Sequence, residues 1–356
     1  MGLIRLILAL AVVLEHSQPI YGYFCVPAST AVSTFFMISG FYMAMICAEK
    51  YNSANGMRAF YSNRILRLLP TYWIALVLAL FVRIYLHFAN LGPSFAWADE
   101  IENCTVADII LLAIPNLTLL GSDLLFIFSF SGNGSWHFNL GMAENRAGRF
   151  LLDGPAWSVG TELWFYLLVP FMARWRTLWL IGVGFASLAL RIYMERSVEW
   201  SSYFFFPANL VLFVAGMLSY RMFRSEKLRA LESKYGLPVL WGVIAYIACR
   251  QYIPFVRNYS ISLYLPIFVC LPLLFQTSKN WSLDRRVGNL SYPIYILHAP
   301  LLLLLQSQFS LNDGLSAIVV TVSIAMLVLK IVEEPLDRYR QKRVYETLRI
   351  ARTLTT

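Results

Sequence analysis

The chain has 356 residues, of which 58% are hydrophobic and only 14% are charged, and its mean hydropathy is +0.60. This composition excludes an ordinary soluble domain and predicts an all-α polytopic membrane protein in contact with the lipid bilayer. The net charge of +9 is typical of basic cytoplasmic loops, so we expect no nucleic-acid partner. The five cysteines form no CxxC pair, and we therefore expect neither a disulfide framework nor a metal site.

Apolar runs of about 17–25 residues, the length that a bilayer requires, recur along the whole chain. The first follows Met1 without a basic leader or a small-residue cleavage site, so we expect it to be retained as a span. We expect about ten transmembrane helices in a single membrane domain, 1–356. Their ranges are 4–20, 27–48, 66–89, 156–172, 177–195, 204–222, 237–254, 260–276, 289–307 and 315–333.

The positions of the basic residues predict the orientation. With the N-terminus inside, most of the 29 Lys and Arg residues fall on the inner side, which predicts cytoplasmic N and C termini in a multi-pass protein of the cytoplasmic (inner) membrane. The range 334–350 has the pattern of an amphipathic helix on the cytoplasmic surface.

The apolar segment 108–130 is long enough to cross the bilayer but is not counted among these spans. A single crossing there would place the basic clusters of 221–234 and 279–286 on the outer side, against the charge rule. Polar and helix-breaking residues such as Pro115 and Gly121 also interrupt it. We therefore expect a re-entrant or interfacial element on the outer face. It belongs to a long outer loop, about 90–155, which is either a binding lid or a passive connector.

Two ionisable residues within the apolar runs are candidates for chemistry, because charges in a membrane are costly. His16 lies roughly 18 Å from the inner end of the first span, where a neutral imidazole serves as a general base or bonds a neighbouring backbone. Glu162 enters its span from outside and is expected at a similar depth. A carboxylate there either orients the imidazole or belongs to an isolated structural ion pair.

Arginines mark the inner side. Arg64 and Arg67 share one helical face, where they either clamp phosphates or snorkel to the inner surface. Arg5 lies about three turns before His16 on nearly the same face. Ser39 and Gly40 form a notch for close helix packing. His298, between Pro293 and Pro300, contacts substrate or satisfies a freed carbonyl group.

These segments, in this order, resemble the membrane-bound acyltransferase family 3, whose members O-acylate cell-surface glycans and some secreted small molecules. The resemblance covers essentially the whole chain, without the extracytoplasmic esterase-like domain that some members carry. The matching segments are Arg5–His16, Phe35–Phe41, Arg64-x-x-Arg67 with Pro70 and Tyr72, Trp157-Ser158 with Glu162, Phe165 and Tyr166, Ser291–His298, and Glu334-Pro335.

The resemblance implies transfer of an acyl group, most commonly acetyl, from cytoplasmic acyl-CoA to a hydroxyl group of an extracytoplasmic glycan, a glycolipid-linked acceptor or a small molecule. Acyl-CoA is then a co-substrate, and no further cofactor is expected. His16 is the expected general base and Glu162 its partner or a substrate ligand. The expected substrate-binding residues are Arg5, Arg64, Arg67, Ser39, Trp157, Tyr166 and His298.

An alternative from another functional class is a proton-coupled transporter or flippase that uses His16 and Glu162 as a proton relay. The two halves of the chain contain no matching repeat with broken helices, which is a pattern common in transporters. A non-catalytic scaffold is disfavoured by the ionisable residues within the spans. The oligomeric state cannot be read from the sequence.

Overall fold

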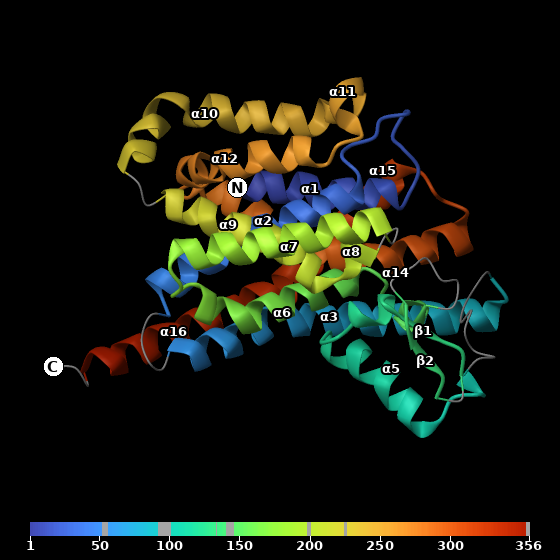
Figure 1. Cartoon of the computed structure of the whole chain (residues 1–356). Helices are drawn as coiled ribbons and strands as arrows, with labels where there is room; N and C mark the ends of the chain where they lie inside the picture. The colour runs from blue at the N-terminus through green and yellow to red at the C-terminus, as the bar shows by residue number, and fades with distance from the viewer. Residues whose placement is uncertain are drawn as a thin grey trace.

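The computed structural model describes residues 1–51, 56–91, 101–132, 134–139, 146–197, 201–223 and 226–353. Long helices lie side by side in a bundle (Figure 1). The first half contains α1 (Gly2–Glu15), α2 (Ala28–Glu49), α3 (Gly56–Ala89), α5 (Val106–Thr118), η1 (Leu124–Phe126), β1 (Phe128–Phe130), β2 (Trp136–Phe138), η2 (Ala147–Phe150), α6 (Ala156–Met172) and α7 (Thr177–Ser197). The second half contains α8 (Ser201–Phe204), α9 (Phe206–Phe223), α10 (Glu226–Cys249), η3 (Arg250–Tyr252), α11 (Pro254–Arg257), α12 (Ile261–Ser278), α13 (Ser282–Asn289), α14 (Ser291–Phe309), α15 (Gly314–Val328), a π-helical turn (Leu329–Glu333) and α16 (Glu334–Thr353).

A helix overlaps each expected span, and seven helices in the described part of the chain are long and apolar enough to cross a bilayer. These are α2, α3, α7, α9, α12 and the joined pairs α13–α14 and α15–α16. Helices α1 and α6 are shorter, with 14 and 17 residues. The count of ten spans and the cytoplasmic position of both termini stay predictions.

The first helix ends earlier than expected, at Glu15 instead of residue 20. The following segment contains Pro19, which cannot continue the helix, and Tyr21 and Gly22 both have positive φ values of 50° and 79°. The backbone N–H of Gln18 donates to the carbonyl oxygen of Asn312 at 2.7 Å. His16 is therefore the residue that ends α1 and is exposed, so the helix ends before the expected end of the span at residue 20.

Helices α2 and α9 approach closely because each has a glycine at the contact. A Cβ atom at Gly40 would lie 2.0 Å from the carbonyl oxygen of Phe213, and one at Gly216 would lie 1.9 Å from that of Met37. The close packing expected at Gly40 is thus confirmed, and it follows the small-residue rule for membrane helices.

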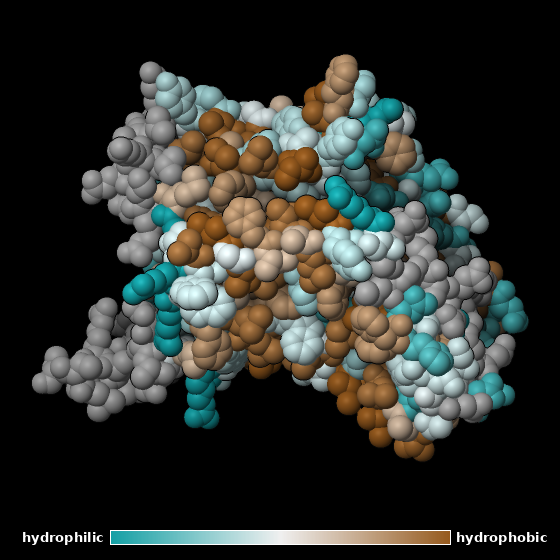
Figure 2. Space-filling model, in the orientation of Figure 1, coloured by the Kyte–Doolittle hydropathy of each residue, from teal (hydrophilic) through white to brown (hydrophobic). Residues whose placement is uncertain are grey.

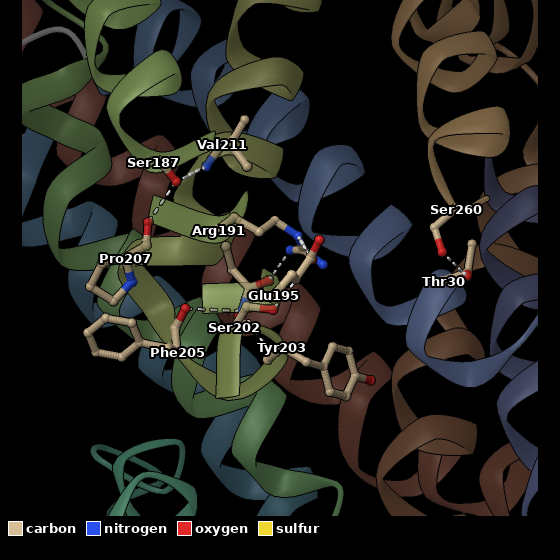
Figure 3. A network of polar contacts seen from close by, with 11 residues as sticks. Thr30, Ser187, Arg191, Glu195, Ser202, Tyr203, Phe205, Pro207, Val211 and Ser260 are labelled. Carbon is tan, nitrogen blue, oxygen red and sulfur yellow. Dashed lines mark hydrogen bonds and ion pairs between the residues drawn. The ribbon is translucent and has the colours of Figure 1, made fainter. Parts of the chain in front are cut away.

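Polar contacts between α7 and α9 add to this packing (Figure 3). The Ser187 hydroxyl donates to the Pro207 carbonyl at 2.6 Å and accepts from the Val211 N–H at 2.8 Å. Arg191 donates to Glu195 at 2.9 Å and to the side chain of Asn209 at 2.9 Å. All of these polar groups are satisfied within the protein, so the structure assigns them a packing role.

The outer loop folds into a small unit in which Asp108 joins α5 to the β1–β2 hairpin. Its carboxylate accepts from the Thr105 hydroxyl at 2.7 Å, the Trp136 indole at 2.7 Å and the Gly134 N–H at 3.0 Å. The hydrogen bonds from Thr105 and Trp136 lower the pKa of Asp108 to about 2. Residues 92–100, 133 and 140–145 of the expected loop 90–155 lie outside the described residues.

Helix α5 has 13 residues and is therefore about 20 Å long, which is too short to cross a hydrocarbon core of about 30 Å. On one of its faces, more than 45% of the surface of each of four apolar residues is exposed, namely Val106, Ile109, Ile110 and Leu117. Figure 2 shows this apolar patch beside the hairpin. A re-entrant or interfacial location of α5 stays a prediction. At the opposite end, α16 continues from α15 through the π-helical turn and projects from the bundle (Figure 1).

Candidate active site

The main candidate site is a cavity of about 610 Å³ between helices α1, α2, α3, α6 and α14. Its volume lies in the usual range for small-molecule sites. The predicted site residues Arg5, Ser39, Arg64, Arg67, Glu162 and Tyr166 all line this cavity. His16, Trp157 and His298 are not among its lining residues.

Arg64 is buried in the cavity wall, with 8% of its surface exposed. Its guanidinium lies over the rings of Phe60 and Tyr166 at 5.8 and 5.9 Å and donates to the Met43 sulfur at 3.8 Å. Its Nε has no hydrogen-bond partner, and no carboxylate pairs with it among the described residues. Ordinary snorkelling would leave the guanidinium in water, so the burial argues for an anionic ligand.

Arg5 and Arg67 reinforce this positive charge. They lie close enough to repel each other electrostatically, and the side chain of neither forms a hydrogen bond or ion pair within the described residues. Glu162 attracts Arg5 and Glu333 attracts Arg67, but two like charges held close together remain unfavourable. A ligand with several negative charges would relieve this repulsion.

The acidic residues of the cavity, by contrast, already have protein partners. Asp284 accepts from the backbone N–H groups of Gly2 and Leu3 at 2.7 and 2.8 Å and so caps the N-terminus of α1. Glu49 accepts from Tyr220 at 3.2 Å, and Asp337 accepts from Gln341 at 2.6 Å and also pairs with Arg340. The cavity therefore combines carboxylates that already accept hydrogen bonds with arginines that form no ion pair within 4 Å among the described residues, and such an excess of positive charge favours an anionic ligand.

Glu162 belongs to this cavity and is held by two hydroxyl groups. Its Oε1 accepts from Tyr166 at 2.5 Å and from Ser39 on α2. It also attracts Arg5 electrostatically. No hydrogen bond or ion pair joins Glu162 to His16 within the described residues, so the structure groups Glu162 with the arginines rather than with the imidazole.

His16 lies at the C-terminal end of α1. Its Nδ1 is 2.8 Å from the carbonyl oxygen of Val12, and its own carbonyl accepts from Gln306 of α14 at 3.2 Å. The neighbouring Glu15 accepts from the Ala28 N–H at the start of α2. Its carboxylate is thus engaged with the α2 N-terminus, where the helix dipole favours negative charge.

The nearest aromatic partner of His16 is His298 of α14. The two ring centroids are 5.1 Å apart and the ring planes are tilted by 54°. His298 is fully buried, and Tyr295, one turn earlier, lies 5.8 Å from it between ring centroids. Because Tyr295 lines the cavity, the rings of Tyr295, His298 and His16 form a continuous path from the cavity to the end of α1.

Trp157 lies in an aromatic cluster rather than in the cavity. It is only 6% exposed and packs against Tyr203 and Phe204 at 4.6 and 4.7 Å. Its expected contact with substrate stays a prediction. The hydroxyl groups of Ser158 and Tyr295 lie 2.6 Å apart at the cavity wall. The sequence did not predict either as a site residue, although both lie in the segments that resemble the family.

The described residues contain no cluster of three or more His, Cys, Asp or Glu side chains able to hold a metal ion. The fold and site thus define a helical membrane protein with a cavity lined by Arg5, Arg64 and Arg67, and Tyr295 of the cavity wall lies next to His298. A family model described as an acyltransferase domain matches residues 1–332, and the chain belongs to this family, acyltransferase family 3.

A curated relative from Aquifex aeolicus (strain VF5) is 23% identical over 198 residues, which cover 52% of this chain and 88% of the relative. It is described only as an uncharacterized protein. No solved structure matches the chain.

Proposed function

We propose that this protein is an O-acyltransferase that moves an acyl group, most commonly acetyl, from cytoplasmic acyl-CoA to a hydroxyl group on the outer side of the inner membrane. The acceptor class is an extracytoplasmic glycan or a glycolipid-linked or small-molecule hydroxyl. Membership of the acyltransferase family supports acyl transfer. The observation that carries the choice of donor is the cavity in which Arg5, Arg64 and Arg67 form no ion pair among the described residues.

Acyl-CoA fits this cavity through its phosphate groups. Guanidinium groups form paired hydrogen bonds with phosphate oxygens, and these bonds are stronger where water is excluded. The cavity continues from the arginines past Ser39 to Tyr295. A thioester arm bound along this path would bring its acyl carbon toward the histidines, with the charged end of the donor held at the arginines.

His16 would act as the general base. Because a carbonyl oxygen only accepts, the hydrogen on Nδ1 donates to Val12, and Nε2 keeps its lone pair. Nε2 takes the proton of the acceptor hydroxyl, the oxygen bonds to the acyl carbon, and the carbon–sulfur bond breaks to release the CoA thiolate. The thiolate then takes up a proton, so the net products are an ester and CoA.

Thiol release from acetyl-CoA by the reconstituted protein, with and without a glycan acceptor, tests this proposal. The wild type should release CoA only with acceptor, and His16→Ala should lower the rate at least about 100-fold, the usual contribution of a general base. His87→Ala is the matched control, because His87 is an exposed histidine at the end of α3.

Equal rates for the wild type and His16→Ala would exclude His16 as the base. A transporter would instead move labelled acceptor across the vesicle membrane without releasing thiol. That outcome would replace the acyltransferase proposal by the proton-relay alternative.

A further inference from the structure

We infer that His298 is a positioning residue that shares the catalytic proton with His16. The sequence had led us to expect Glu162 as the residue that orients the His16 imidazole. This inference rests on the proposed function, since it assigns a partner to the proposed general base. Two observations support it: the buried Nε2 atom of His298 has no hydrogen-bond partner, and the His298 and His16 ring centroids are 5.1 Å apart.

The backbone fixes the tautomer of His298. Its Nδ1 is 2.5 Å from the carbonyl oxygen of Tyr295, so Nδ1 carries the hydrogen and Nε2 presents a lone pair. The side chain is 0% exposed, and Nε2 has no hydrogen-bond partner. An orphaned buried acceptor costs free energy, and such groups are retained where they serve chemistry.

His16 is prepared in the same way. Its Nδ1 donates to Val12 one turn earlier in α1, as His298 donates to Tyr295 in α14. In both residues the nitrogen that faces away from its own backbone bond is therefore an acceptor. Two lone pairs do not attract each other, but a proton that one nitrogen takes up can be shared with the other once the two nitrogens approach.

The separation of the rings suits such sharing. The centroids are 5.1 Å apart, and Nε2 of His298 has no hydrogen-bond partner in this structure, so a rotation of the His16 ring brings the two Nε2 atoms into hydrogen-bond range when a proton is taken up. Helices α1 and α14 pack directly against each other. The Gln306 amide, which donates to the His16 carbonyl, also holds Asn312 at 2.8 Å, and this anchors the end of α1 to α14.

The chemical step follows from these contacts. When Nε2 of His16 takes the hydroxyl proton, the new N–H donates both to the attacking acceptor oxygen and to Nε2 of His298. As the oxygen bonds to the acyl carbon it loses basicity, and the bond to His298 remains. The proton then leaves His16 for the thiolate, and both imidazoles return to their neutral tautomers. No oxidant, reductant or metal ion takes part.

Asn and Gln variants of His298 separate this role from a structural one. The amide of Asn reaches the position of Nδ1 and preserves the donation to Tyr295, but it leaves nothing at the position of Nε2. The longer Gln side chain places an acceptor oxygen near Nε2. We expect His298→Asn to lower kcat about 10- to 100-fold with unchanged KM values for donor and acceptor, and His298→Gln to recover most of this loss.

The assay measures thiol release together with acetyl-CoA affinity, so that folding of each variant is checked by donor binding. A raised acceptor KM at unchanged kcat would make His298 a substrate ligand and overturn the inference. Equal losses in the Asn and Gln variants, or no loss in Asn, would also overturn it. These results differ from failure of the proposed function, in which the wild type itself releases no thiol.

Discussion

Replacing Arg64 by methionine should change donor affinity and protein stability in opposite directions. Arg64 is 8% exposed and has two aromatic neighbours and a sulfur contact, but no carboxylate partner. A charge-assisted hydrogen bond contributes about 1.5–3 kcal/mol. Loss of one such bond to a donor phosphate should raise the Kd for acetyl-CoA about 10- to 150-fold.

The same substitution removes a buried cation from the protein without donor. Methionine fills a similar volume and has no charge to desolvate, so the unliganded protein should become more stable, with a Tm higher by roughly 1–3 °C. Adding acetyl-CoA should stabilise the wild type by about 2.7 kcal/mol at 100 times its Kd. The variant should lose most of this shift at the same concentration.

Calorimetric titration and thermal unfolding with and without acetyl-CoA measure both effects. Arg58→Ala is the matched control, because Arg58 is an exposed arginine on the same helix and does not line the cavity. The reasoning is refuted if Arg64→Met binds acetyl-CoA like the wild type, or if Arg58→Ala weakens binding to the same degree. Either result would return Arg64 to the role of a topology signal.

Three further substitutions test other parts of the structure. Glu162→Gln removes the negative charge beside Arg5 and should tighten acetyl-CoA binding about threefold; an increased Kd in the same titration would contradict its placement as a cavity anion. Burial raises the pKa of Asp123 to about 6, while the hydrogen bond that the Trp164 indole N–H donates to its carboxylate at 3.0 Å acts in the opposite direction. Protonation of Asp123 therefore stabilises the fold below about pH 4, and this contribution is lost as pH rises through 6, so Asp123→Asn should raise the Tm much more at pH 8 than at pH 4.5; an equal change at both values would disprove it. The lowered pKa of Asp108 has the opposite sign, so its stabilisation is present above about pH 4 and lost toward pH 2; Asp108→Asn should speed hydrogen exchange in residues 128–138 at pH 7, and unchanged exchange would be inconsistent with its bonds to the hairpin.

The helical membrane fold and the arginine site follow from local sequence rules. Apolar length predicted a helix at each expected span. The spacing of Arg64 and Arg67 predicted a shared face, and both line the cavity together with Arg5. Gly40 was recognisable as a packing position because only a glycine allows a backbone carbonyl so close.

The partner of His16 was not predictable from depth alone. His16 and Glu162 were expected to meet because both lie near the outer ends of their spans. The partner of His16 depends instead on which helices are neighbours, and α1 packs against α14. Glu162 consequently meets Ser39 of α2. The early end of α1 reflects Pro19 and the positive φ values of Tyr21 and Gly22, and Gln18 bonds to Asn312 before α15.

Acyl transfer across a sealed membrane is the most direct test of the central claim. The protein would be reconstituted in one orientation into vesicles that enclose acetyl-CoA labelled in the acetyl group, with a glycan acceptor supplied outside only. The account predicts labelled acceptor outside and free CoA thiol inside, both abolished in His16→Ala. Label that reaches the acceptor only when donor and acceptor share one compartment would contradict transfer across the bilayer.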